Sequence, residues 1–299
     1  MTQDTTAPII PTPTIIQGHH DNYDLPAQPN RLASTFANHH DLPSYHKQWD
    51  IIWKEHYTPW DRGAPSPALS GLLTSPPSPF RAATLFPKHS STTGNNPPKA
   101  LVPGCGRGYD PLLLSSFGYD VVGLDLSPTS LSKAKELESF VSSSSSSTSS
   151  SSSSAAAAAE IYAVKPGVEK KGKITWVQGD FFKDEFLRSA GTGKFDVIFD
   201  YTFFVALPPT ARPAWAKRMK ELLDPETGRL VCLEWPLRRD IKAGGPPWGV
   251  TKESYEEVLG GDGNGQGLKR LCRYQPEQTH PAGYDEEGRV IDFVSVWGY

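Results

Sequence analysis

The sequence predicts an α/β protein built on a doubly wound, mostly parallel seven-stranded sheet that ends in an antiparallel edge hairpin. From Lys99 onward, short apolar runs alternate with helical patterns, which is typical of parallel sheets covered on both faces. The first run leads into a glycine-rich turn and a helix, as in nucleotide-binding sheets. The last two predicted strands, residues 268–274 and 290–297, have no helix between them, so we expect them to pair antiparallel.

Composition excludes several classes of protein. The chain has 299 residues and a formal charge of −3, with a pI near 6.2, so it lacks the basic character of nucleic-acid-binding proteins. Three scattered cysteines do not form a disulfide framework or a zinc site. No stretch is long and apolar enough to predict a membrane span or a secretory signal. We therefore expect a monomer in the cytoplasm, with no nucleic-acid or membrane partner.

The chain is expected to divide into a tail and one domain. Residues 1–44 are rich in Pro, Thr, Asn, Gln and His without periodicity, which predicts a disordered tail. The domain, residues 45–299, begins with a helix at Tyr45. Pro59 disfavours a helical conformation at the residue before it and so ends this helix in a turn. A short helix is predicted over residues 67–73.

A glycine-rich turn follows the first predicted strand, residues 100–102, and precedes a helix from Tyr109. Its glycines stand at alternate positions, Gly104, Gly106 and Gly108. Glycine permits positive φ and lets a ligand approach the backbone, and the helix N-terminus attracts electronegative groups. The spacing differs from the Gly-x-Gly-x-x-Gly of dinucleotide sites, which favours a nucleoside without a pyrophosphate. A glycine turn that binds no ligand is the alternative.

The following segment is expected to contain an insertion. The second strand ends in Asp125, and Ser127 caps a helix over residues 128–141. A serine run broken by one threonine and then five alanines follow. Such low complexity does not build a core, so we predict a mobile loop insertion at about residues 142–170. Within it, a helical extension of the alanines towards residues 160–164 stays open. Deletion of residues 142–159 is expected to leave stability nearly unchanged.

Strands and helices then alternate to the end of the domain. The further predicted strands and helices are strand 174–180, helix 182–189, strand 195–201, helix 209–223, strand 228–235 and helix 251–259. The fifth of the seven strands, residues 228–235, has high β propensity, and Thr251 opens the last helix as its N-cap.

Acidic residues end three predicted strands: Asp125, Asp180 and Asp200. In an open α/β sheet, ligands bind at the carboxyl ends of the strands. A carboxylate at Asp125 can accept from both ribose hydroxyls, and Asp180 is placed one strand further out, where an adenine amino group can donate to it. For any one of these acids, an N-cap or turn role is the alternative.

Aromatic residues form a second candidate part of the site. Trp49, Trp53 and Trp60 precede the glycine turn, and Tyr201 and Phe203 follow the fourth strand. Since Trp49 and Trp53 are four residues apart, packing of their helix onto the sheet is the alternative to a binding role. As a lid, the tryptophans would attract a cation such as a sulfonium and exclude water from it.

Seven segments carry a resemblance to a known family. They are residues 58–61, 102–110, 121–127, 179–182, 195–204, 212–217 and 244–248. Together they resemble the thiol methyltransferases of the thiopurine-methyltransferase-like family, which includes the plant enzymes that methylate halides and thiocyanate. The resemblance covers most of residues 45–260 and implies a Rossmann-like fold that binds S-adenosylmethionine.

The resemblance also implies individual roles. Gly104 and the tryptophans lie against the methionine part of the cofactor, and Asp125 holds the ribose. Asp180 and Phe181 flank the adenine, and Tyr201 lies beside the sulfonium. The implied cofactor-binding residues are Trp49, Trp53, Trp60, Gly104, Gly106, Gly108, Asp125, Asp180, Phe181 and Tyr201.

The expected reaction is methyl transfer to a small thiol or anion, such as bisulfide, thiocyanate or a halide, by in-line displacement. Such acceptors attack as anions, so no general base is needed. Tyr201 stands where the animal enzymes have arginine, which favours the plant branch, and Trp235 stands where that branch usually has tyrosine. Arg212 is a candidate to assist a thiolate, with a plain helix-surface role as the alternative. No role is predicted for His280 or Cys105.

Two further functions stay open. An O- or N-methyltransferase of a small metabolite would use the same scaffold but needs a base near the methyl group. A non-catalytic protein that binds S-adenosylmethionine is the other. No metal site is predicted.

Overall fold

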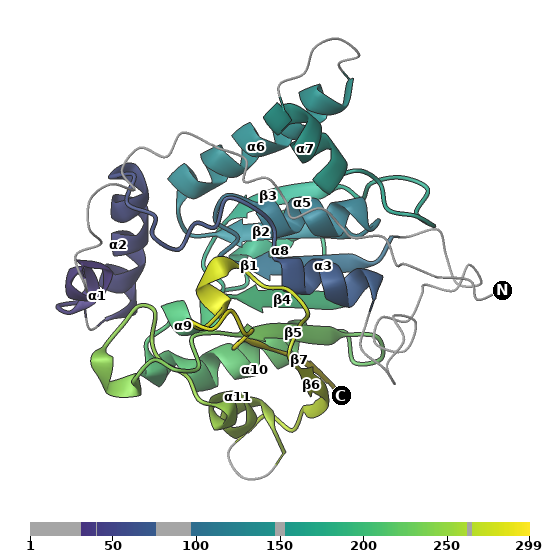
Figure 1. The fold of residues 1–299 in the computed structure, drawn as a ribbon. Helices are drawn as coiled ribbons and strands as arrows, with labels where there is room; N and C mark the ends of the chain where they lie inside the picture. The colour runs from purple at the N-terminus through teal and green to yellow at the C-terminus, as the bar shows by residue number, and fades with distance from the viewer. Residues whose placement is uncertain (1–30, 40, 76–96, 147–152, 262–264) are drawn as a thin grey trace.

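The computed structural model describes residues 31–39, 41–75, 97–146, 153–261 and 265–299, and its strands form one seven-stranded sheet (Figure 1). The strands are β1 (Lys99–Pro103), β2 (Asp120–Asp125), β3 (Ile174–Gln178), β4 (Val197–Tyr201), β5 (Arg229–Glu234), β6 (Lys269–Tyr274) and β7 (Phe293–Gly298). Their order is β3-β2-β1-β4-β5-β7-β6. The first five are parallel, and β7 lies antiparallel between β5 and β6. The predicted fold class is confirmed.

Helices cover both faces of the sheet because the strand residues alternate between two apolar layers. Leu101 and Ile198 pack in a core with Trp215, whereas Ala100 and Phe199 pack in the opposite core. On the first face lie α8 (Glu185–Ala190), α10 (Arg212–Leu222) and α11 (Lys252–Leu259). On the second lie α3 (Pro67–Thr74), α5 (Tyr109–Ser116), α6 (Pro128–Ser146) and α7 (Ser153–Ile161).

Ordered structure begins before Tyr45. Helices α1 (Arg31–Phe36) and α2 (Leu42–Lys54) lie together at one end of the sheet (Figure 1). The buried Phe36 ring lies 4.5 Å from that of Tyr45, between ring centroids. The predicted disordered tail is therefore wrong for residues 31–39 and 41–44, because a six-residue helix is too short to show periodicity. Residues 1–30 lie outside the described residues.

The alanine-rich segment also departs from its prediction. Helix α6 continues to Ser146, and α7 packs beside it (Figure 1). Ala158 and Tyr162 are completely buried in the core that α5 lines. Alanine has the highest helix propensity, and its small side chain lets α7 approach its neighbours closely. The expected mobile insertion is thus wrong for residues 153–162, while residues 147–152 lie outside the described part of the chain.

The connections that follow the strands complete the fold. They contain α9 (Phe203–Ala206) and three single 3₁₀ turns, η1 (Pro209–Ala211), η2 (Ile241–Ala243) and η3 (Pro281–Gly283). The predicted cap of α6 is confirmed, since the Ser130 N–H donates to Ser127 Oγ at 3.1 Å. None of the helices in the described ranges has the length and apolarity needed to cross a membrane.

Candidate active site

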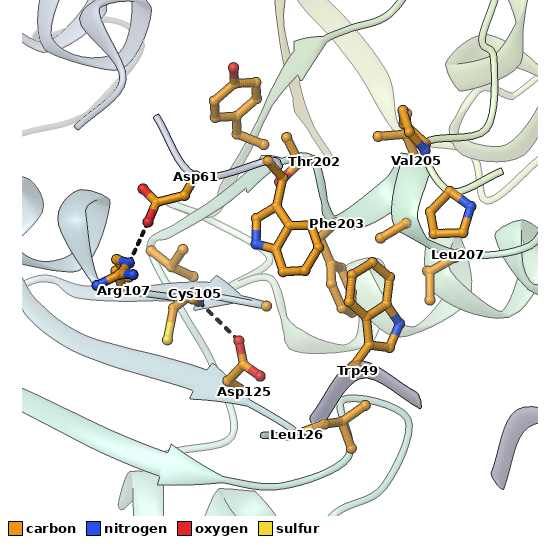
Figure 2. A pocket seen from close by; sticks show the side chains of 18 of the residues that line it. Trp49, Asp61, Cys105, Arg107, Asp125, Leu126, Thr202, Phe203, Val205 and Leu207 are labelled. Carbon is orange, nitrogen blue, oxygen red and sulfur yellow. Dashed lines mark hydrogen bonds and ion pairs between the residues drawn. The ribbon is translucent and has the colours of Figure 1, made fainter. Parts of the chain in front are cut away.

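A cavity of about 310 Å³ opens at the carboxyl ends of the parallel strands, with α2 on its other side (Figure 2). It is lined by ten of the residues singled out from the sequence: Trp49, Trp53, Trp60, Gly104, Gly106, Asp125, Asp180, Phe181, Tyr201 and Trp235. Two others, Gly108 and Arg212, are not among its lining residues.

The glycine loop needs its glycines for two different reasons. Gly104 has φ +60°, and a Cβ there would lie 2.6 Å from Phe203 Cδ2, so only glycine leaves this part of the cavity open. Gly106 has φ +53° and faces Trp53. Gly108, at φ +79°, is the N-cap of α5, and a Cβ there would collide with Trp176. Its predicted contact with a cofactor therefore has no geometric support.

Asp125 is held by the backbone at the end of β2. Gly106 N–H donates to its Oδ2 and Ser127 N–H to its Oδ1, both at 2.9 Å. Figure 2 shows the carboxylate extending towards the glycine loop. Burial raises its pKa, against the effect of these hydrogen bonds. Since two backbone donors fix the group, its remaining lone pairs are directed for a ligand in the cavity.

Asp180 follows β3 and lies beside a histidine that the sequence did not single out. The Phe182 N–H donates to Asp180 Oδ1 at 2.9 Å, and His46 Nδ1 on α2 lies 3.7 Å from Asp180 Oδ2. Burial lowers the pKa of His46, although the nearby Asp180 opposes the shift. The adjacent Phe181 ring packs edge-on against Phe203, with 5.2 Å between centroids.

The third strand-end acid, Asp200, has a different place. It is 1% exposed and accepts from Trp215 Nε1 at 2.8 Å and from the Phe204 N–H at 3.0 Å. Burial raises its pKa to about 7. Asp200 therefore fastens α9 and α10 to the sheet and is absent from the cavity lining, so the expectation of three acids in series at the site is wrong.

Arg212 is likewise turned into the protein. Its Nη2 donates to the Gly249 carbonyl at 3.1 Å, and its guanidinium lies 4.6 Å from the centroid of the Phe204 ring. The side chain is buried on the α10 face, away from the cavity lining. Neither a substrate contact nor a helix-surface position fits this geometry.

The tryptophans form one aromatic cluster. Trp60 packs edge-on against Trp49 at 5.3 Å and against Trp53 at 5.7 Å, between ring centroids. Arg107 of the glycine loop lies 5.9 Å from the Trp53 ring centroid and forms an ion pair with Asp61 (Figure 2). The cluster thus joins α2 to the glycine loop while it lines the cavity, so the packing role and the predicted lid position coexist.

Four residues that contact one another form what we term the Arg62 cluster: Arg62, Tyr201, Trp235 and His280. All four line the cavity. The Tyr201 and His280 rings are stacked, 5.7 Å apart and 9° from parallel. The Arg62 guanidinium lies 5.3 Å from the centroid of the Trp235 ring, and the Trp235 Nε1 donates to the Ala282 carbonyl at 3.1 Å.

The protonation states in the Arg62 cluster follow from burial. Burial lowers the pKa of His280 to about 4, and the Arg62 charge adds to the shift. Burial raises the pKa of Tyr201 to about 12, and Arg62 opposes this. At neutral pH the imidazole is uncharged and the phenol keeps its proton. No sequence signal marked His280, which lies far from every motif, whereas Arg62 directly follows one.

The cavity suits a ligand that is polar at one part and cationic or apolar at another. Carboxylates that can accept from hydroxyl or amino groups lie at Asp125 and Asp180, and aromatic rings form much of the wall. No group of three His, Cys, Asp or Glu side chains that could hold a metal ion occurs within the described ranges.

Comparisons with known proteins agree with this geometry. The family model for thiopurine S-methyltransferase matches residues 45–283. Thiocyanate methyltransferase 1 of Arabidopsis thaliana is 35% identical over 211 residues, which cover 71% of this chain and 70% of the relative. Probable thiol methyltransferase 2 of the same plant is 34% identical over 212 residues, covering 71% of this chain and 70% of the relative.

Solved structures are similar to this chain at lower identity. A protein from work on the conversion of a disulfide bond into a thioacetal group during echinomycin biosynthesis is 18% identical, with a TM-score of 0.50 over 85% of this chain and 91% of that one. Magnesium protoporphyrin IX methyltransferase from Synechocystis PCC 6803, solved with bound SAM, is 14% identical, with a TM-score of 0.42 over 68% of this chain and 71% of that one.

Proposed function

Since this chain belongs to the thiopurine S-methyltransferase family and is an S-adenosylmethionine-dependent methyltransferase, we propose that its acceptor is a small thiol or anion such as bisulfide, thiocyanate or a halide. Its similarity to a thiocyanate methyltransferase and to a probable thiol methyltransferase supports this acceptor class.

The residues of the cavity fit the cofactor. The Asp125 carboxylate would accept from the ribose hydroxyls, and Asp180 with Phe181 would bind the adenine. The open backbone at Gly104 leaves room for the methionine part, since a side chain there would collide with Phe203. Trp49, Trp53 and Trp60 would cover the sulfonium and exclude water from it.

The proposed reaction is an in-line displacement. When bound, the cofactor supplies a methyl group on a cationic sulfur; the acceptor's lone pair forms the new bond to carbon while the carbon–sulfur bond breaks and its electron pair stays on sulfur. No proton moves when the acceptor is already an anion. The chain's contribution is then alignment of the reacting atoms and exclusion of water, and alignment alone can supply ~7–11 kcal/mol.

The protonation states of the Arg62 cluster carry the proposal. A general base works best when its pKa lies near the working pH. His280, with a pKa of about 4, and Tyr201, with a pKa of about 12, are both far from neutrality. The cluster therefore suits an acceptor that needs no proton removed.

One observation favours a second candidate function. Asp110 also lines the cavity, and burial raises its pKa to about 7. A carboxylate of that pKa could serve as a base for O- or N-methyl transfer to a small metabolite. Under this alternative, Asp110→Asn would abolish product formation. Under the first proposal, the same variant would still transfer the methyl group to an anion.

An acceptor panel tests the proposal. Purified protein with S-adenosylmethionine is incubated with iodide, bisulfide, thiocyanate or small organic thiols, and the methylated products are measured by mass spectrometry. We expect product from at least one of these acceptors. Absence of product from all of them, with product from a hydroxyl or amine acceptor, would establish the second candidate instead.

Trp235 is proposed to limit the size of the acceptor. Its ring is fixed by Arg62 on one side and by its hydrogen bond to the Ala282 carbonyl. Trp235→Ala should enlarge the cavity and raise turnover of bulkier thiols relative to thiocyanate, as measured by the ratio of kcat/KM values. An unchanged ratio would remove Trp235 from the acceptor site.

A further inference from the structure

Arg62 lines the cavity and hydrogen-bonds Tyr201, but the protein does not use all of its donors. Its Nε is buried without a hydrogen-bond partner in the part of the chain that the structure describes. Its Nη1 reaches the Pro59 carbonyl only at 3.5 Å. The guanidinium instead lies against the Trp235 ring and beside Tyr201. A half-buried guanidinium whose buried Nε lacks an acceptor favours an anion in the cavity that occupies its donors.

The neighbouring acids offset this charge only in part. Asp61, the preceding residue, forms its ion pair with Arg107. The Asp292 carboxyl accepts from Thr279 Oγ1 at 2.5 Å and is absent from the cavity lining. Burial raises its pKa to about 6 while the Arg62 charge opposes the shift, so at neutral pH Asp292 is ionised and offsets part of the Arg62 charge from outside the cavity. Asp110 lines the cavity, and because burial raises its pKa to about 7 it carries only part of a negative charge at neutral pH. His280 is uncharged at neutral pH. The guanidinium is therefore the charged group of the Arg62 cluster that faces the cavity.

We propose that Arg62 binds the negative charge of the methyl acceptor, with the Tyr201 hydroxyl as a second donor. This inference rests on the proposed function and names the group that selects the acceptor. Guanidinium donors beside an uncharged imidazole and an aromatic ring attract a small anion and disfavour a neutral or cationic acceptor. The same charge lowers the pKa of a bound thiol, which keeps it as the reactive thiolate.

The proposal predicts that loss of Arg62 affects KM more than kcat. The acceptor's negative charge is present when it binds and disperses as the methyl group is transferred, so Arg62 stabilises the bound acceptor more than the transition state. Arg62→Gln should raise the KM for thiocyanate about 10- to 100-fold, the range for loss of a charged hydrogen-bond partner, and change kcat less. Arg62→Lys, which keeps the charge, should recover most of the loss.

A matched control removes the same charge elsewhere. Arg188 is exposed on α8 and does not line the cavity. Arg188→Gln should leave the KM for thiocyanate unchanged, and all variants should bind S-adenosylmethionine as the wild type does in calorimetry. For a small organic thiol, the pH profile of kcat/KM should move to higher pH in Arg62→Gln only. Equal constants for Arg62→Gln and Arg188→Gln, or an unmoved pH profile, would overturn the proposal.

A binding measurement separates this proposal from the proposed function. Thiocyanate is titrated into the protein with S-adenosylhomocysteine, so that no turnover occurs, and tryptophan fluorescence reports binding near Trp235. Binding that Arg62→Gln weakens supports the inference even if wild-type protein forms no methyl thiocyanate, which would contradict only the proposed function. Turnover of thiocyanate with constants that Arg62→Gln and Arg62→Lys leave unchanged contradicts only the inference. If Arg62→Gln does not fold, nitrate should still inhibit the wild type competitively against thiocyanate, and its failure to do so would count against the proposal.

Discussion

Replacement of Asp125 by asparagine offers a sharp test of the proposed cofactor site. A carboxylate offers about four lone-pair positions. Two are occupied by the Gly106 and Ser127 N–H groups, at 2.9 Å each. The Leu126 N–H and the Ser130 hydroxyl also stabilise the carboxylate, and ligand hydroxyls would use the acceptor capacity that remains. Asparagine keeps one oxygen and replaces the other with an NH₂ group, which cannot accept a hydrogen bond.

Two effects of Asp125→Asn follow, and they can be measured separately. One backbone N–H loses its acceptor, which should lower the free energy of unfolding by ~1–3 kcal/mol. For a chain of 299 residues that corresponds to a fall in Tm of roughly 2–5 °C. Loss of the charged acceptor for the ribose should raise the Kd of S-adenosylmethionine about 10- to 100-fold.

The chain supplies its own control in Asp200. This residue also ends a parallel strand, is buried, and accepts two hydrogen bonds from the protein. Asp200→Asn should therefore lower Tm by a similar amount and leave the Kd nearly unchanged. Differential scanning fluorimetry gives the Tm and isothermal titration calorimetry the Kd. If Asp125→Asn binds the cofactor as tightly as Asp200→Asn does, the proposed role of Asp125 is refuted.

Three further predictions concern the loop, the buried acids and α7. Gly104→Ala should cost ~1–2 kcal/mol for its left-handed backbone and displace Phe203, which would appear as a lower Tm together with a higher cofactor Kd; an unchanged Kd would contradict it. Burial raises the pKa values of Asp110 and Asp200 in the folded protein to about 7. Their contribution to stability is therefore full below pH ~4 and is lost as the pH rises to about 7. Urea unfolding at several pH values should show this decline, and Asp110→Asn should make it smaller. Tyr162, which directly follows α7, is buried, so Tyr162→Ala should lower the free energy of unfolding by ~3–5 kcal/mol. Tyr162→Phe should leave it unchanged, because the buried hydroxyl has no hydrogen-bond partner among the described residues. Equal Tm values for the two variants would show that packing of this ring does not stabilise the fold.

Local sequence patterns predicted most elements because five of the seven strands, β1, β2, β4, β5 and β7, are largely buried apolar runs. Local patterns do not encode the order of the last strands in the sheet, because β7 pairs with β5 and β6 through contacts between residues far apart in sequence. A helical extension of the alanines was open from the sequence, but the packing of α7 into the core was not predicted, because a run of alanines has no amphipathic pattern even though burial of Ala158 needs only a small side chain.

Asp125 and Asp200 look alike in sequence because each follows an apolar run, but only Asp125 lines the cavity. The difference depends on which face of the sheet each side chain lies on. Side chains alternate along a strand. Tyr201 shares the face of Phe199, whereas Asp200 shares the opposite face with Ile198 and meets Trp215 there. The side that faces the ligand depends on register and helix packing, which the pattern of acids does not encode. His280 was missed for a related reason, because the β6–β7 connection reaches the cavity only once the sheet has formed.

The position of β7 constrains how this protein is made. The strand at residues 293–298 lies inside the sheet, between β5 and β6. During synthesis, β5 cannot obtain this neighbour until residue 298 has left the ribosome, so the nascent chain exposes an unpaired, apolar strand edge until then. A chain interrupted before β7 would lose an internal strand, and its open edge would be available for pairing with other chains. Premature termination is therefore expected to produce aggregates rather than a shortened, folded enzyme.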